Sequence, residues 1–103
     1  GISIFPEIFS PDNDGTDDQL NFSFRFAKPG QVVNLDVFDS NGIRVASPAK
    51  SVLMPAESIL AWNGAGDGGR RLEPGIYILY IEVIDIDGKT TSKLKTCVIA
   101  YRY

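Results

Sequence analysis

The sequence predicts an all-β fold, a β-sandwich of about seven antiparallel strands. Turn-forming clusters of Gly, Pro, Asn and Asp recur roughly every 10–15 residues along the chain. Between these clusters lie short runs rich in Val, Ile, Phe and Tyr, the residue types most enriched in strands. No longer window shows the periodicity of an amphipathic helix, so we expect essentially no α-helix.

The first half of the chain supplies three predicted strands. Leu20 to Phe26 alternates apolar and polar side chains, which places one face of the strand in the core and the other in solvent. Gln31 to Phe38 follows the same alternation. A short edge strand over Ile43 to Ala46 is expected to pair with it as a hairpin through the Asn41-Gly42 turn.

The second half supplies three more predicted strands, over Ser58 to Trp62, Ile76 to Ile86 and Thr91 to Ala100. The Ile76 to Ile86 run is apolar on both faces, which is typical of a central covered strand or of a strand that meets a partner. One helical turn is expected near Pro55 to Glu57. The predicted core consists of Leu20, Phe22, Phe24, Phe26, Val33, Leu35, Val37, Trp62, Tyr77, Leu79, Ile81 and Val83.

Composition limits the function. The chain has 103 residues, which fits a single domain spanning residues 1–103. It carries 10 Lys and Arg against 13 Asp and Glu, a net charge of −3, which argues against a nucleic-acid partner. There is no histidine and one cysteine, which excludes histidine-dependent triads, histidine-ligated metals and an internal disulfide. No apolar run is long enough to insert into a membrane, and we do not expect an enzyme.

The densest polar cluster is DNDGTDD at residues 12–18. It aligns with the first half of an EF-hand calcium loop, although Asn21 replaces the final bidentate Glu. The alternative is a solvated loop in which Asx-turns, rather than a metal, satisfy the carboxylates. The predicted calcium ligands are the carboxylates of Asp12, Asp14 and Asp18 and the carbonyl of Thr16.

Three smaller polar features have structural interpretations. The Asp85–Gly88 turn is predicted to be a hairpin tip. Cys97 lies in the last strand and is predicted to be a small buried hydrophobe rather than a nucleophile. The pair Arg70-Arg71 is expected to pack in its loop, by stacking on Trp62 or by pairing with Asp67.

Three blocks of the sequence carry a family resemblance. They are FSPDNDGTDD at residues 9–18, LDVFDSNGIRV at residues 35–45, and WNG, GRRL and PGIY within residues 62–77. Together they resemble the immunoglobulin-like C-terminal domains of large secreted bacterial surface proteins. The chain looks closest to the immunoglobulin-like domain of the flagellar hook-capping family. It is also similar to the gliding-motility-associated domains, which are the type B sorting domains of type IX secretion.

The resemblance implies an immunoglobulin-like or fibronectin-III-like sandwich that forms the C-terminal module of a larger exported protein. Its location would be secreted or at the cell surface, associated with the outer membrane. The residue types of the third block indicate a structural role. A tryptophan that fills the end of the sandwich, glycines that form its turns and a tyrosine in the core determine the fold and do not form an active site. These structural residues are Trp62, Gly64, Gly69, Pro74, Gly75 and Tyr77.

Three functions remain open at this stage. The first is a non-catalytic structural or adhesion module whose partners are the upstream domains of the same chain. The second is a sorting signal read by the type IX export machinery, although Ser40-Asn41-Gly42 stands where sorting domains usually carry Arg-Trp-Gly. The third is a carbohydrate-binding accessory module for surface glycans, for which Tyr80, Tyr101 and Tyr103 are the candidate aromatic residues.

Overall fold

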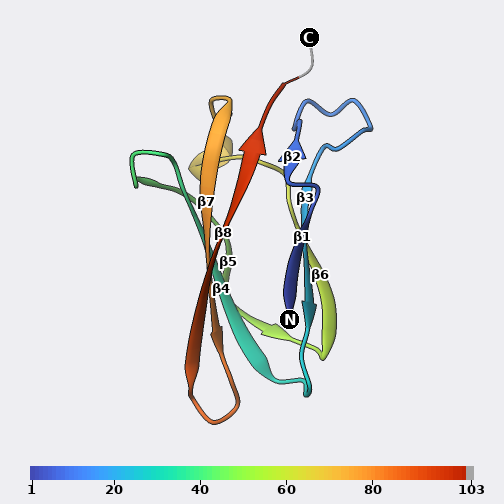
Figure 1. Ribbon diagram of the computed structural model, residues 1–103, viewed down its shortest axis with the longest axis vertical. Helices are drawn as coiled ribbons and strands as arrows, with labels where there is room; N and C mark the ends of the chain where they lie inside the picture. The colour runs from blue at the N-terminus through green and yellow to red at the C-terminus, as the bar shows by residue number, and fades with distance from the viewer. Residues whose placement is uncertain (102–103) are drawn as a thin grey trace.

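The computed structural model describes residues 1–101 and consists of two β-sheets packed face to face (Figure 1). One sheet has three strands in the order β1-β3-β6, and the other has five in the order β2-β8-β7-β4-β5. The predicted β-sandwich is therefore confirmed. The strands are β1 (Ile2–Phe5), β2 (Ile8–Phe9), β3 (Leu20–Arg25), β4 (Gln31–Phe38), β5 (Arg44–Met54), β6 (Glu57–Trp62), β7 (Gly75–Ile84) and β8 (Thr90–Ile99).

The predicted strands recur with small changes at their ends. β4 occupies its predicted range, and β3, β6, β7 and β8 differ from theirs by one or two residues. The 39–43 turn joins β4 to β5 as an antiparallel hairpin, with the Asp39 N–H donating to the Ile43 carbonyl at 2.9 Å. The only helical element among residues 1–101 is the 3-10 turn η1 (Asp67–Gly69).

The strand predicted over Ile43 to Ala46 is wrong in its length, because β5 continues to Met54. Its pairing with β4 shifts register at several points, and Ser51 has a φ of 50°. Such bulges break the alternation of apolar and polar side chains from which a strand is predicted. The helical turn predicted near Pro55 to Glu57 is also absent, since Glu57 already begins β6.

The N-terminal strands β1 and β2 were not predicted, because they are too short for a pattern of alternation. β1 pairs antiparallel with β3, and the chain then crosses to the other sheet through Pro6. There β2 pairs with the end of β8 in a parallel orientation. The expectation of antiparallel strands throughout is therefore wrong at this one ladder.

The core lies between the two sheets. Every predicted core residue is buried except Phe26, which follows β3, is partly buried and packs against the cluster. β7 is central in the five-stranded sheet, but only its inner face is covered, and Ile78, Tyr80 and Ile84 are half-buried on its outer face. The buried apolar residues that were not predicted are Phe9, Val45, Ala46, Ala49, Met54, Leu72 and Ile99.

The loops gather at the two ends of the sandwich. The segment of residues 10–19, the loop of residues 63–74 and the end of β8 lie at one end, which is the top of Figure 1. The 85–88 hairpin tip lies at the opposite end. The acidic cluster and the loop that follows Trp62 therefore lie at the same end of the fold.

Candidate functional site

The acidic loop, defined here as residues 10–19, connects β2 to β3. The carboxylates of Asp12, Asp14 and Asp18 converge, so that one oxygen from each lies within 4.8 Å of the other two. Ser10 is buried at the base of the loop, and its Oγ donates a hydrogen bond to Asp12 Oδ2 at 2.8 Å. The structure thus brings together the three carboxylates that the sequence predicts as ligands, above an anchored loop base.

The same carboxylates accept hydrogen bonds from backbone amides of the loop. The Asp18 carboxylate accepts hydrogen bonds from the amide of Asp14 at 3.0 Å and from the amide of Gly15 at 2.7 Å. Asp14 in turn receives the amide of Thr16 at 2.9 Å, which is an Asx-turn. Asn13 and Gly15 have positive φ angles, the left-handed conformation that Asn and Gly tolerate best. These bonds confirm that Asx-turns shape the loop.

The hydrogen bonds do not exclude a cation, because each carboxylate oxygen has more than one lone pair. Calcium takes six to eight oxygen ligands, and three converging carboxylates supply the charged part of such a set. What the structure shows is an acidic triad with the spacing to hold a metal ion. The Thr16 carbonyl as a further ligand stays a prediction.

The Trp62 corner, defined here as residues 62–77, leads from β6 to β7 at the same end of the fold. The Trp62 indole is buried, lies beside the Phe9 ring at 5.7 Å, and donates through Nε1 to the Ala65 carbonyl at 3.0 Å. Gly64 has a φ of 80°, and a Cβ atom there would lie 2.9 Å from the Pro11 ring. Only glycine satisfies both conditions, so this turn packs directly against the acidic loop.

The second half of the corner is held by Tyr77. Its hydroxyl donates to the Glu73 carbonyl at 2.6 Å, and burial raises the pKa of the phenol above its usual value. A tyrosine at the start of a strand, bonded to backbone a few residues upstream, is a hallmark of immunoglobulin-like sandwiches. Pro74 precedes β7, while Gly69 and Gly75 have positive φ angles. The polar atoms of Trp62 and Tyr77 are therefore bonded to the backbone of the corner itself.

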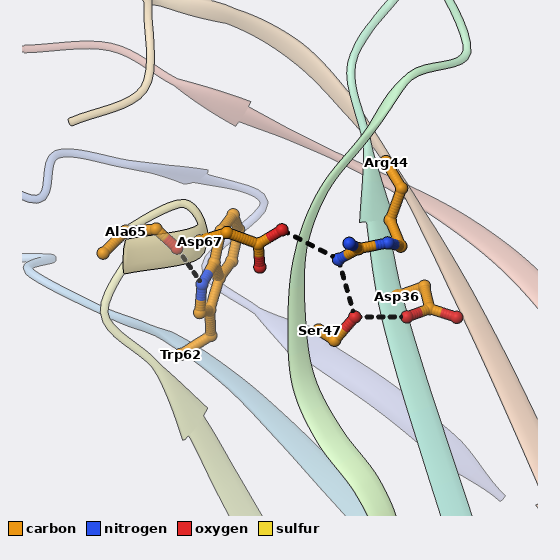
Figure 2. A network of polar contacts seen from close by, with 6 residues as sticks. All are labelled: Asp36, Arg44, Ser47, Trp62, Ala65 and Asp67. Carbon is orange, nitrogen blue, oxygen red and sulfur yellow. Dashed lines mark hydrogen bonds and ion pairs between the residues drawn. The ribbon is translucent and has the colours of Figure 1, made fainter. Parts of the chain in front are cut away.

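A polar network ties this corner to the five-stranded sheet (Figure 2). Arg44 pairs with Asp67 at 3.0 Å and donates to Ser47 Oγ at 3.0 Å, and Ser47 Oγ donates to Asp36 at 2.6 Å. About half of each charged side chain is exposed to solvent, so the ion pair contributes little to stability. The expected pairing of Asp67 with Arg70 or Arg71 is wrong, because Arg44, which was not singled out in the sequence, takes that position.

The two candidate aromatic residues that the structure describes, Tyr80 and Tyr101, make separate contacts. Arg71 lies over the Tyr101 ring at 3.8 Å, rather than over Trp62, and the Tyr101 hydroxyl donates to the Leu72 carbonyl at 2.7 Å. Tyr80 lies on the outer face of β7, with its hydroxyl 3.0 Å from Ser92. Tyr103 lies outside the described residues. One face of the Tyr101 ring is therefore already covered, which weakens the carbohydrate-binding interpretation.

Two of the smaller sequence interpretations are confirmed. Cys97 is buried in the core, and burial raises the pKa of its thiol to about 12, which keeps it protonated and unreactive. Asp85 Oδ1 accepts the amides of Asp87 and Lys89, both at 2.9 Å, which makes the 85–88 segment a hairpin tip. Within residues 1–101, no helix has the length and apolar character needed to cross a membrane.

Comparison with known proteins gives matches among solved structures only. No known family model matches the chain, and no curated protein sequence matches it. FlgD from P. aeruginosa and FlgD from Xanthomonas campestris each match 79% of this chain, with 25% identity and a TM-score of 0.58. The Xanthomonas protein acts in hook capping, which is essential for flagellar assembly. The chain spans 61% and 57% of the lengths of these two proteins.

A third match covers nearly the whole chain. PorZ is an essential bacterial surface component of the type IX secretion system of Porphyromonas gingivalis. It matches 97% of this chain, with 21% identity and a TM-score of 0.57, but the matched region is only 11% of PorZ. The chain is therefore an immunoglobulin-like β-sandwich similar in fold to domains of bacterial flagellar and type IX secretion proteins, as its motifs predicted.

Proposed function

We propose that this chain is a non-catalytic immunoglobulin-like module of a larger secreted or cell-surface bacterial protein, in which it has a structural or adhesive role. The observation that carries the proposal is the match to PorZ, where almost the whole of this chain corresponds to a small fraction of a long surface protein. A sandwich that recurs as a piece of a longer chain acts through its position and its surfaces.

The Trp62 corner supports this proposal. The indole of Trp62 and the hydroxyl of Tyr77 each donate to a carbonyl of the corner. These most distinctive residues of the sequence are thus committed to building one end of the sandwich. In this proposal, the faces and edges of the sheets and the loops at its ends make the contacts with other domains.

The alternative is a sorting signal for type IX secretion. The similarity to part of a component of that system favours this alternative, and the two functions make opposite predictions for an isolated module. A sorting signal is sufficient to export an unrelated protein. A structural module depends on signals elsewhere in its parent chain.

A secretion assay separates the two functions. Residues 2–103 are fused to the C-terminus of an inert reporter that carries its own signal peptide, and expressed in a host with a type IX system. We expect the reporter to remain in the periplasm, as it does without the fused domain. Reporter on the surface or in the medium, lost when the secretion system is deleted, would overturn the structural role and establish the sorting signal.

We also propose calcium as a ligand of the acidic loop. The convergence of Asp12, Asp14 and Asp18 within 4.8 Å supports this proposal. The chain forms no disulfide with its one cysteine, and a cation that ties β2 to β3 would stabilise the loop between them. Thermal unfolding in calcium and in chelator is the test, and we expect calcium to raise the midpoint.

A further inference from the structure

The edge of β8 is open along most of its length. On one side, β8 pairs with β7 from end to end in an unbroken antiparallel register. On the other side, the short strand β2 pairs only with Val98 and Ile99. Among residues 1–101, no strand covers the outer edge of residues 90–96.

The open edge continues a ladder that β2 begins. The amide of Val98 donates to the Glu7 carbonyl at 2.8 Å, and the amide of Ala100 donates to the Phe9 carbonyl at 3.0 Å. Alternate residues of a strand direct their N–H and C=O groups to the same side. The backbone groups of the even-numbered residues Ser92, Leu94 and Thr96 therefore face the open side, in line with the positions that β2 already uses.

The other long edge of the same sheet is protected against strand addition. β5 contains Pro48, its pairing with β4 shifts register, and Ser51 has a φ of 50°. Proline and bulges disrupt the backbone pattern that a further strand needs, whereas edge lysines, the other common protection, act through their charge. β8 contains neither proline nor a register shift, so its free edge has the regular geometry that a further strand requires.

Two lysines of β8 determine which charge an added strand should carry. Lys93 and Lys95 alternate with the outward-facing backbone groups, and neither forms an ion pair with the described residues. A second copy that paired antiparallel about Lys93 or Leu94 would place lysine opposite lysine, which is unfavourable. The same lysines favour carboxylates at alternate positions of an added strand.

The opposite face of the strand carries one large exposed apolar side chain, Leu94, between the polar Ser92 and Thr96. Leu94 is 69% exposed and lies opposite Tyr80 of β7, while the neighbouring Ile78 lies opposite Thr96. Apolar side chains at the intervening positions of an added strand would cover Leu94. We propose that the free edge of β8 binds an extended segment of a partner protein in which acidic residues alternate with apolar ones, by strand addition.

The direct test uses the 103-residue chain and a capped peptide of sequence Glu-Val-Asp-Ile-Glu-Val-Asp, with Lys-Val-Lys-Ile-Lys-Val-Lys as its control. We expect the acidic peptide to perturb the backbone amide resonances of Ser92, Leu94 and Thr96, and to bind more weakly as salt is raised. Perturbations centred on the free edge of β6 would overturn the proposal. So would the absence of binding at peptide concentrations up to about 1 mM.

Charge reversal tests the specificity. The double variant Lys93→Glu with Lys95→Glu should weaken binding of the acidic peptide by about tenfold or more, because two cross-strand attractions become repulsions. It should also acquire binding of the basic peptide, a gain that a misfolded variant would not show. Lys28→Glu with Lys50→Glu changes the net charge equally away from β8 and should leave both affinities unchanged. An equal loss in this control would show non-specific attraction and overturn the proposal.

A proline variant tests the backbone contribution. The amide of Ser92 faces the open side, so Ser92→Pro removes a donor that β7 does not use. We expect weaker binding of the acidic peptide with a thermal midpoint near that of the wild type. Unchanged peptide affinity in this variant would show that side-chain charge alone accounts for binding, and would overturn strand addition.

Discussion

The acidic loop and the Trp62 corner lie at the same end of the sandwich and use the same kind of bond in different surroundings. In both segments, side chains bond to nearby backbone groups. In the corner, Trp62 is 4% exposed and Tyr77 is 5% exposed, so their hydrogen bonds are partly shielded from solvent. In the acidic loop, the amide bonds to Asp14 and Asp18 form in solvent-exposed surroundings. Similar local chemistry therefore stabilises the fold in one segment and only shapes a loop in the other.

Burial explains the difference. A buried donor that loses its acceptor incurs a desolvation cost, whereas an exposed one is satisfied by water. The corner also buries large apolar area with its polar atoms, and the loop does not. Substitutions in the corner should therefore reduce the free energy of unfolding by more than equivalent substitutions in the loop.

The largest effect is expected from Trp62→Ala. The indole fills the space between β6 and Phe9, and its removal leaves a cavity and an unpaired Ala65 carbonyl. Large aromatic-to-alanine changes in cores cost about 3–5 kcal/mol. Urea denaturation followed by circular dichroism measures this loss. Trp62→Phe should lose less, and a loss below about 1 kcal/mol in Trp62→Ala would contradict the assignment of Trp62 as the plug of the corner.

The next effect compares two glycines with the same backbone conformation. Gly64 in the corner has a φ of 80°, and Gly15 in the acidic loop has a φ of 87°. Alanine at either position costs about 1–2 kcal/mol for the left-handed conformation. A Cβ atom at Gly64 would also lie 2.9 Å from Pro11, whereas one at Gly15 would meet nothing within 4 Å. Gly64→Ala should therefore be the more destabilising by roughly 1–3 kcal/mol.

Equal losses for the two glycine variants would contradict this interpretation. They would mean that the approach of Pro11 relaxes at no cost, and that the corner is not packed tightly against the acidic loop. Thermal midpoints for the two variants and the wild type, measured in one buffer containing chelator, make the comparison.

A smaller effect is expected from Tyr77→Phe. It removes the hydrogen bond to the Glu73 carbonyl and leaves the ring in place, which should cost about 1 kcal/mol. Tyr80→Phe removes a hydroxyl that contacts Ser92 at the surface, and its cost should stay within about 0.5 kcal/mol. Urea denaturation measures both variants. Indistinguishable midpoints would show that the corner hydroxyl contributes no more than the exposed one.

The strands were predictable where alternation is regular. In β4, buried Val33, Leu35 and Val37 alternate with half-buried neighbours, and its bounds were predicted without error. The full length of β5 was not predicted, because bulges in its pairing with β4 interrupt the alternation of buried and exposed residues. Its buried Ala46 and Ala49 are also too small to stand out as apolar positions in the sequence. Phe9 was missed for another reason, since its two-residue strand is defined only by pairing with β8.

The candidate site was predictable in its residues and not in its contacts. The spacing of Asp12, Asp14 and Asp18 placed them together, because carboxylates at alternate positions of a tight loop converge. The partner of Asp67 was not predictable. Arg44 follows the 39–43 turn and reaches the 3-10 turn η1 only through the packing of the two sheets. Pairing across that distance in sequence depends on the tertiary fold, which local sequence patterns do not predict.

The smallest expected effect concerns the acidic loop and its proposed calcium. Asp18→Asn keeps only one of the two oxygens that accept backbone amides. Because the loop is exposed, water satisfies the amide that loses its acceptor, so without calcium the cost should stay within about 0.5 kcal/mol. With calcium at a few times its dissociation constant, binding stabilises the wild type by roughly 1 kcal/mol. The Asp18→Asn variant should lose this gain because it removes one charged ligand of the triad. Thermal unfolding of both proteins in calcium and in chelator measures the difference.

Asp17→Asn is the matched control, because it removes the same charge from the same loop at a residue that is not a member of the triad. If calcium binds at the triad, the Asp17→Asn variant should keep most of the calcium-dependent rise in the midpoint. An equal loss in both variants would mean that calcium only screens the negative charge of the loop. No rise in the wild type in millimolar calcium would leave the hydrogen bonds to Asp14 and Asp18 as the whole explanation of the acidic cluster. The acidic loop and the Trp62 corner would then differ only in burial, since side chains in both segments would bond to the backbone of their own segment.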